Sequence, residues 1–315
     1  MRNPRRLVIL ALATSVTMLS AACGSSTSGS SVLSSIKVDG NDAAKAPTVT
    51  VTKTPLNATT SESKVLKEGT GAALTGKDLT KVKAVIVNGT DGKVVGSTWD
   101  SAPTAIDLSQ DALFAALKSQ LPGKKIGSRV LIAAPPKDVF GKDGNTGAGL
   151  KGTDSVVFVI DIMSATQPLT EAKGSPVPAK ADLPTVTVKD TKTPATITIP
   201  SGVSAPTSLV VQPLITGTGP EVQDGQTVRV TYTGALWKDG SVFDSSATSA
   251  LKHFDFVVGQ QGIISGWNKG IKGQKVGSRM LLVVPPSEGY GAAGQGTKIS
   301  GTDTLVFVVD ILAAL

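Results

Sequence analysis

The sequence contains one cysteine and one histidine, and each shortage argues against a class of site. Cys23 cannot form a disulfide within the chain, and His253 has neither a second histidine nor a neighbouring cysteine with which to hold a metal. The sequence offers no recognisable Ser-His-Asp triad around this one histidine. The formal net charge is +7, but without Arg2, Arg5 and Arg6 it falls to 28 basic against 24 acidic residues, or +4. This weak, scattered excess argues against a nucleic-acid-binding surface.

Aromatic residues make up only 4% of the 315 residues, whereas glycine and proline are abundant. With 34 glycines, 18 prolines and 40% hydrophobic residues, the composition predicts short strands and many turns rather than helical bundles. The length exceeds that of one typical domain, so we expect two compact units. Most aromatic residues of the second half lie between Val228 and Phe307 beside glycines and turns, as is typical of a small apolar pocket.

Residues 1–22 have the pattern of an export signal, because arginines precede an apolar run from Leu7 to Leu19 that is short for a membrane span. The run Leu19-Ser-Ala-Ala-Cys23 resembles the lipobox of bacterial lipoproteins, except that Ser20 stands where that family prefers leucine. The resemblance implies that Cys23 is lipidated and that the exported chain is anchored to the outer face of the bacterial cytoplasmic membrane. A secreted protein with an ordinary signal is the alternative.

From Cys23 to residue 46 the sequence is rich in Ser, Gly and Thr and predicts a flexible tether. The rest of the chain repeats itself in order. The matched pairs are Pro47-Thr-Val-Thr-Val51 with Pro184-Thr-Val-Thr-Val188, Trp99-Asp-Ser101 with Phe243-Asp-Ser245, Gly127-Ser-Arg129 with Gly277-Ser-Arg279, Phe140-Gly141 with Tyr290-Gly291, and Asp154 to Phe158 with Asp303 to Phe307. We therefore predict two copies of one domain, over 47–165 and 184–315, with a proline-containing linker over 166–183.

Each copy is mostly strand by pattern. Val228 to Tyr232 alternates with period two, and the runs Arg279 to Val284 and Leu305 to Ile311 are β-branched and apolar. Short helices are predicted over Ile263 to Ile271 and, in the first copy, over Asp111 to Ser119, each followed by a glycine-containing stop. The expected fold class is α+β, with each copy a curved antiparallel sheet wrapped around one short helix.

The second copy resembles the FKBP family of peptidyl-prolyl cis-trans isomerases over most of its length. The matching motifs are Val230-Thr-Tyr-Thr-Gly234, Asp239-Gly240, Phe243-Asp-Ser-Ser246, Phe254-Asp-Phe256, Ile263-Ile-Ser-Gly-Trp267, Gly289-Tyr-Gly291 and Thr304-Leu-Val-Phe307. Two features depart from the family: Gly262 stands where glutamate is frequent, and the loop 295–301 lacks the usual prolines.

The resemblance implies a pocket with Trp267 as its floor, the Ile264 backbone N–H meeting a ligand carbonyl, and polar contacts at its mouth. The implied catalytic residues are Asp244, Tyr290, Trp267, Phe307 and Tyr232. The implied substrate-binding residues are Phe243, Phe254, Ile263, Ile264 and Ile299, the last in an overhanging loop. Any one of the aromatic residues is more simply explained as core, and Asp244 or Tyr290 alone as a turn residue. Their joint agreement with one family's pocket favours a site.

The implied activity is rotation about X–Pro peptide bonds, whose barrier is roughly 18–20 kcal/mol. No bond is broken, so we expect no cofactor, no metal and no covalent intermediate. The expected partners are proline-containing unfolded or exported polypeptides and macrolide inhibitors, with membrane attachment through the lipid and no nucleic acid. The alternative function is a non-catalytic peptide-binding module or holdase chaperone of the cell envelope that uses the same pocket.

The first copy is predicted to have a degenerate pocket. Leu117 takes the place of Trp267, Phe140 that of Tyr290, and the Tyr232 position falls near Ile86, although Trp99-Asp100 is retained. Weak or absent isomerase activity is expected there. A spacer, a substrate-holding surface and a dimerisation surface all remain open as its role.

Overall fold

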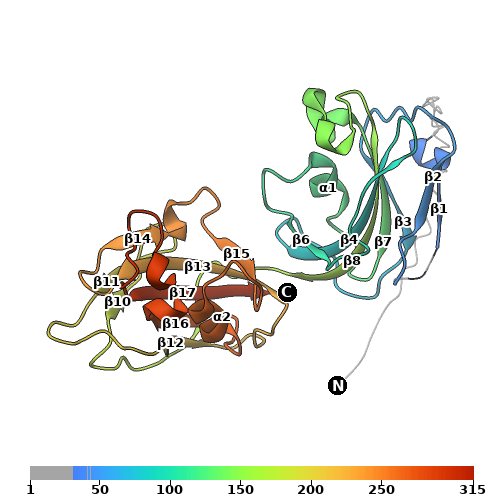
Figure 1. Cartoon of the computed structure of the whole chain (residues 1–315). Coiled ribbons are helices and arrows are strands. Elements are labelled where there is room, and N and C mark those ends of the chain that lie inside the picture. The colour runs from blue at the N-terminus through green and yellow to red at the C-terminus, as the bar shows by residue number, and fades with distance from the viewer. Residues whose placement is uncertain (1–30, 41, 43) are drawn as a thin grey trace, which may run out of the picture. The chain divides into compact units, whose positions relative to one another are not determined.

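The computed structural model describes residues 31–40, 42 and 44–315, so the predicted export signal and Cys23 lie outside the described residues. Two domains follow one another along the described chain, and each is built on its own antiparallel sheet (Figure 1). Within these residues, no helix combines the length and the apolarity that crossing a membrane requires.

The first domain contains a six-stranded sheet of order β3-β7-β8-β4-β5, with β6 also paired to β4. Its strands are β3 (Glu62–Lys67), β4 (Leu79–Asn88), β5 (Val94–Ser97), β6 (Thr104–Asp107), β7 (Arg129–Ala134) and β8 (Val156–Thr166). The helix α1 (Ala115–Gln120) lies on one side of this sheet, and the hairpin β1 (Ile36–Asp39) and β2 (Thr48–Val51) lies on the other (Figure 1). The 3-10 helices are η1 (Val32–Ser35), η2 (Pro136–Asp138), η3 (Gly141–Asp143) and η4 (Thr146–Ala148).

The second domain repeats this plan with a seven-stranded sheet of order β14-β13-β17-β16-β12-β9, with β15 paired to β13. Its strands are β9 (Gly174–Pro176), β12 (Val210–Gly217), β13 (Thr227–Leu236), β14 (Val242–Ser245), β15 (Phe254–Val257), β16 (Arg279–Val284) and β17 (Leu305–Ala314). The remaining elements are α2 (Ser265–Ile271), the hairpin β10 (Thr185–Thr187) and β11 (Thr196–Thr198), and the 3-10 helices η5 (Ser246–Thr248), η6 (Pro286–Glu288) and η7 (Gly291–Ala293). This arrangement confirms the predicted α+β class.

Both faces of the second sheet are buried. In β16, Met280 and Leu282 join the apolar cluster around α2, whereas Leu281 and Val283 join a second cluster that includes Ile197 of the hairpin. Successive side chains of a strand point to opposite faces, so a strand covered on both sides needs apolar residues at consecutive positions. The continuous apolar runs of β16 and β17 follow from this double covering.

The predicted helices exist but begin later than the sequence pattern indicates. Ile264, directly before α2, is extended with φ −58° and ψ 143°, and Phe114, directly before α1, has φ −49° and ψ 130°. The apolar residues that precede each helix therefore belong to the connecting loop. In the second domain this loop lines the pocket.

Parts of the expected tether and linker are ordered as strands. Ile36–Asp39 pairs with β2, and Ile36 is buried in the cluster beneath that hairpin. In the linker, β9 pairs with the edge of β12, while Lys173 N–H donates to the Gly277 carbonyl at 2.8 Å and Val177 N–H to that of Leu214 at 2.9 Å. Backbone pairing at a free sheet edge explains why a short segment without a strand pattern becomes ordered.

The apolar cluster between the β10–β11 hairpin and the sheet should contribute to the stability of the second domain. Ile197→Ala should lower the free energy of unfolding by about 2–5 kcal/mol, because Ile197 is buried among hairpin and sheet residues and its truncation leaves a cavity. Denaturant unfolding followed by tryptophan fluorescence measures this loss. The exposed neighbour Thr198 is the matched control, and an equal loss on Thr198→Ala would contradict the assignment of Ile197 to a core.

Candidate functional site

The second domain contains an open apolar pocket of about 250 Å³. It is lined by Tyr232, Phe243, Asp244, Phe254, Gly262, Ile263, Ile264, Trp267, Tyr290 and Phe307. Strands β13, β14, β15 and β17 supply the wall residues, the loop before α2 supplies one rim, and Tyr290 follows η6. The residues come from distant parts of the sequence, so the curvature of the sheet is what brings them together.

Trp267 forms the floor and is only 4% exposed. Its ring meets Tyr232 edge-on with centroids 5.2 Å apart and Phe307 at 5.3 Å, both in T-shaped geometry. Helix α2 reaches this position because Gly266 and Gly270 face β16: an added Cβ at either glycine would stand 2.7 Å from Val284 or Leu282. These two glycines permit the close approach of helix and sheet that sets the depth of the floor.

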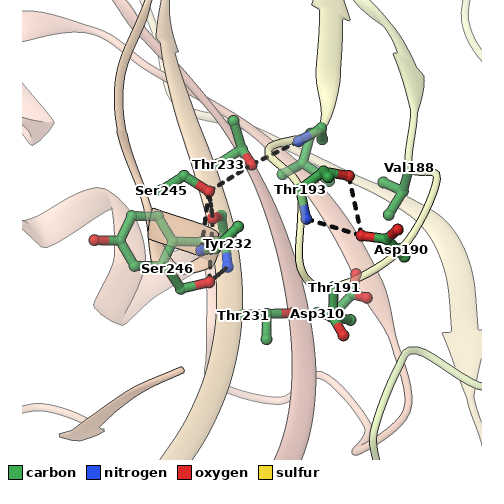
Figure 2. Close-up of a pocket in the computed structure, with 13 residues that line it drawn as sticks. Val188, Asp190, Thr191, Thr193, Thr231, Tyr232, Thr233, Ser245, Ser246 and Asp310 are labelled. Atoms are coloured by element: carbon green, nitrogen blue, oxygen red, sulfur yellow. Dashed lines mark hydrogen bonds between the residues drawn. The ribbon is translucent and has the colours of Figure 1, made fainter. Parts of the chain in front are cut away.

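The strand that carries Tyr232 is fixed both by side chains next to it in the sheet and by the hairpin that packs on the sheet's other face. Ser246 Oγ accepts the Tyr232 backbone N–H at 2.9 Å, and Ser245 Oγ donates to the Tyr232 carbonyl at 2.9 Å. Figure 2 shows that Thr233 joins this network, where its hydroxyl accepts the Ala195 N–H of the hairpin at 2.9 Å. A cavity of about 20 Å³ between hairpin and strand has room for one water molecule.

The mouth of the pocket is polar. The Tyr232 hydroxyl donates to Asp244 Oδ2 at 2.5 Å, and the Ser245 N–H donates to Asp244 Oδ1 at 2.8 Å. Burial and this hydrogen bond raise the pKa of the Tyr232 phenol above its ordinary value near 10. Burial, with a smaller effect of the Asp244 charge, also raises the pKa of Tyr290. Both hydroxyls therefore remain protonated at neutral pH, and the Tyr290 hydroxyl lies beside the pocket as a donor.

A polar contact ties the Tyr290 segment to the floor helix. Glu288, two residues before Tyr290, accepts a hydrogen bond from Ser265 Oγ of α2 and one at 2.6 Å from Lys269 Nζ. The hydrogen bond from Lys269 lowers the pKa of Glu288, so this carboxylate is charged at neutral pH. The contact connects the residue at the mouth with the helix that carries Trp267.

Nine of the ten residues predicted for the site line this pocket together. Ile299 lies in an adjoining depression and is only 6% exposed, packed in the core cluster around α2. The functional roles assigned to these residues remain predictions. Sequence reasoning missed Phe256, whose ring meets Trp267 at 5.6 Å and stacks on Phe254 at 5.9 Å. The period-two spacing in Phe254-Asp-Phe256 placed both rings on one face and was the available signal.

The strand register corrects the expected counterparts in the first domain. Ala84 N–H donates to Thr98 Oγ1 as Tyr232 N–H donates to Ser246 Oγ, so Ala84 holds the place of Tyr232. Ile86 pairs with Phe158 as Gly234 pairs with Phe307, so the expectation that Ile86 lies near the Tyr232 position is wrong by two residues. Gly96 pairs with Ile86 as Asp244 pairs with Gly234. The counterpart of Asp244 in the first domain is therefore Gly96.

The retained Trp99-Asp100 pair is therefore no remnant of the pocket wall. Trp99 is 5% exposed and belongs to the cluster beneath the β1–β2 hairpin, on the other face of the sheet from α1. Trp99-Asp100 resembles Phe243-Asp244 in sequence but not in position. Phe243 and Asp244 lie within β14, whereas Trp99 and Asp100 follow the end of β5.

Aromatic packing fills the equivalent space of the first domain. Phe114, which stands directly before α1 as Ile264 stands before α2, meets Phe140 with ring centroids 4.8 Å apart. It also lies 6.2 Å from the ring of Phe158. The first domain thus lacks the indole floor, both tyrosine hydroxyls and the carboxylate of the second.

The raised phenol pKa values predict an unusual alkaline titration, because Tyr232 and Tyr290 are the two tyrosines of the sequence. In the folded chain, tyrosinate absorbance should rise only above the ordinary pKa near 10, and Asp244→Asn should move the transition to lower pH. The unfolded state releases these protons first, so stability should fall as pH rises above about 10. A transition centred at the ordinary value, with circular dichroism showing an intact fold, would contradict this electrostatic description.

Comparison with known proteins agrees with this geometry. The profile of the FKBP-type peptidyl-prolyl cis-trans isomerase family matches residues 74–163 and 219–312, together more than half of the chain. A protein of Corynebacterium glutamicum named "Probable FK506-binding protein" is 40% identical over 119 residues, which cover 38% of this chain and 96% of that protein. The FK506-binding protein of Streptomyces anulatus is 39% identical over 113 residues, which cover 36% of this chain and 90% of that protein.

Among solved structures, the three FKBP domains of wheat FKBP73 are similar at 20% identity with a TM-score of 0.34, covering 81% of this chain and 94% of that one. The two profile matches fall one in each domain, and the identities to the bacterial relatives extend over nearly their full length. The chain therefore belongs to the FKBP family of peptidyl-prolyl cis-trans isomerases, with two FKBP domains in tandem.

Proposed function

We propose that the second domain accelerates X–Pro bond rotation and that the first domain does not. One observation carries this assignment: the second domain has an open pocket with an indole floor and a protonated tyrosine at its mouth, and the first has phenylalanine rings packed in the equivalent place. The same family profile matches both domains, so the proposed difference in activity rests on the residues of the pockets and not on the fold.

Desolvation supplies the first part of the mechanism. The proline ring enters the pocket onto Trp267, and the X–Pro amide leaves water for an apolar wall of aromatic residues. A planar amide has a larger dipole than the twisted amide of the transition state, so transfer out of water destabilises the ground state more. Every 1.36 kcal/mol of this difference raises the rate about tenfold, against a barrier of roughly 18–20 kcal/mol.

Hydrogen bonding supplies the second part. The Tyr290 hydroxyl donates to the carbonyl of the residue before proline as that carbonyl rotates, and the Ile264 backbone N–H meets a carbonyl on the other side of the ring. Asp244 acts indirectly by holding the Tyr232 hydroxyl at 2.5 Å, which fixes the orientation of this aromatic wall residue. A macrolide would occupy the same pocket, in keeping with the names of the relatives.

We further propose that the substrates are exported polypeptides. The support is the signal pattern of residues 1–22 and the lipobox-like run that ends at Cys23, both of which lie outside the described residues. Lipidation at Cys23 would hold the isomerase at the outer face of the cytoplasmic membrane, where newly exported chains emerge unfolded. Slow X–Pro isomerisation limits the folding of such chains.

The isomerase proposal predicts that, of two matched substitutions in the full chain, one lowers the activity and the other leaves it unchanged. Tyr290→Phe should lower kcat/KM for a short X–Pro peptide roughly tenfold, because one hydrogen bond to the transition state is lost. Phe140→Tyr, the reverse change at the equivalent position of the first domain, should leave kcat/KM unchanged. Exchange NMR of the peptide measures both rates. An unaltered rate in Tyr290→Phe would contradict the role of this hydroxyl.

The anchor proposal predicts that Cys23→Ser abolishes incorporation of labelled fatty acid and releases the protein from the membrane fraction of cells that export it. A thioether to diacylglycerol cannot form on serine, and the rest of the export signal is unchanged. Equal labelling of the native and Cys23→Ser chains would rule out lipidation at this residue. Isomerase activity of the soluble variant serves as the control for folding.

A further inference from the structure

A second depression adjoins the apolar pocket of the second domain. It measures about 380 Å³ and shares Phe243, Asp244 and Tyr290 with the first pocket. Its outer wall is the loop Gln295–Ile299, which is closed on itself because Gln295 N–H donates to the Ile299 carbonyl at 2.8 Å and Ile299 N–H to the Gln295 carbonyl at 3.3 Å. The side chain of Ile299 is buried, so this end of the loop is fixed.

Lys298 lies on this wall, and its ammonium is held next to Phe243, a residue that lines both the pocket and the depression. Its Nζ donates to the Phe243 carbonyl at 3.0 Å, one residue from Asp244. By contrast, Lys269 is ion-paired with Glu288 at 2.6 Å and Lys238 with Asp303 at 3.0 Å. Among the described residues, no carboxylate lies within ion-pair distance, 4.0 Å, of Lys298. Lys298 thus places a cation without an ion-pair partner among the residues that line the depression.

The direction of a bound peptide connects this lysine with the substrate. With the proline ring on Trp267, the X–Pro carbonyl meets Tyr290, and the depression begins at Tyr290. In that pose, the depression bounded by Lys298 is the space next to Tyr290 that is open to the side chain of residue X, directly before the proline. The neighbouring carboxylate of Asp244 already accepts two hydrogen bonds, from Tyr232 and Ser245, whereas the Lys298 ammonium is held by a neutral carbonyl.

We propose that Lys298 is a specificity-determining residue that favours peptides with aspartate or glutamate immediately before the proline. This inference rests on the proposed isomerase function of the second domain and specifies its substrate class. Lys298 is exposed, so the contribution of one ion pair is modest, roughly two- to fivefold in kcat/KM, and falls with ionic strength.

The test uses the full chain and three peptides that differ only in residue X: glutamate, glutamine or lysine. The quantity measured is the ratio of kcat/KM for the Glu–Pro peptide to that for the Gln–Pro peptide, at low and high salt. Lys298→Met should lower this ratio roughly two- to fivefold at low salt, and Lys298→Glu should lower it further while raising the relative rate of the Lys–Pro peptide. High salt should shrink each difference.

The matched control is Lys192→Met, which removes the same charge from an exposed site in the hairpin loop that lies away from the pocket lining. It should leave the ratio unchanged, and the rate for the uncharged Gln–Pro peptide should be similar in every variant. Equal Glu-to-Gln ratios in the native and Lys298→Met chains, with the Gln–Pro peptide still accelerated, would overturn this inference alone. No acceleration of any of the three peptides by the native chain would overturn the proposed isomerase function as well.

Discussion

The contact on which the site depends is the close packing of α2 against β16. Gly266 and Gly270 let the helix backbone approach the sheet, and Trp267, between them, is thereby set into the ring of aromatic side chains that the sheet supplies. A side chain at either glycine would stand within 3 Å of the Val284 or Leu282 side chain and would force a local rearrangement between helix and sheet. The pocket is thus a consequence of helix-to-sheet distance, and the strand residues form its walls because the sheet curves around that helix.

The two domains show how the same fold keeps or loses a site. Both sheets are covered on one face by a helix and on the other by an N-terminal hairpin, and both bury two apolar clusters. In the first domain Ile86 replaces Gly234, at whose position an added Cβ would stand 2.6 Å from Phe243. Side chains that fill the cavity stabilise a core by the same hydrophobic burial that an open pocket forgoes. In the first domain, Phe114, Phe140 and Phe158 pack against one another at the place of the second domain's pocket.

Much of the second domain could be predicted from its sequence, because the pocket residues fall in short motifs that match those of the FKBP family in order and spacing. The class of fold, the single helix of each domain and the pairing of Trp267 with its aromatic neighbours followed from these motifs. The strand β9 could not be predicted, since its order comes from pairing with the distant β12 edge. Strand register was equally inaccessible: Trp99-Asp100 matches Phe243-Asp244 in letters, but backbone pairing assigns Gly96 to the aspartate position.

The most direct test of the account uses the three tryptophans of the chain, one in each of three places: Trp99 in the first domain, Trp237 beneath the β10–β11 hairpin and Trp267 in the pocket floor. Their indole N–H signals should be recorded by ¹⁵N NMR while an isomerising X–Pro peptide is added to the full chain. We predict that the Trp267 signal shifts in step with the acceleration of exchange and that the signals of Trp99 and Trp237 stay in place. A response of Trp99 with a silent Trp267 would contradict it.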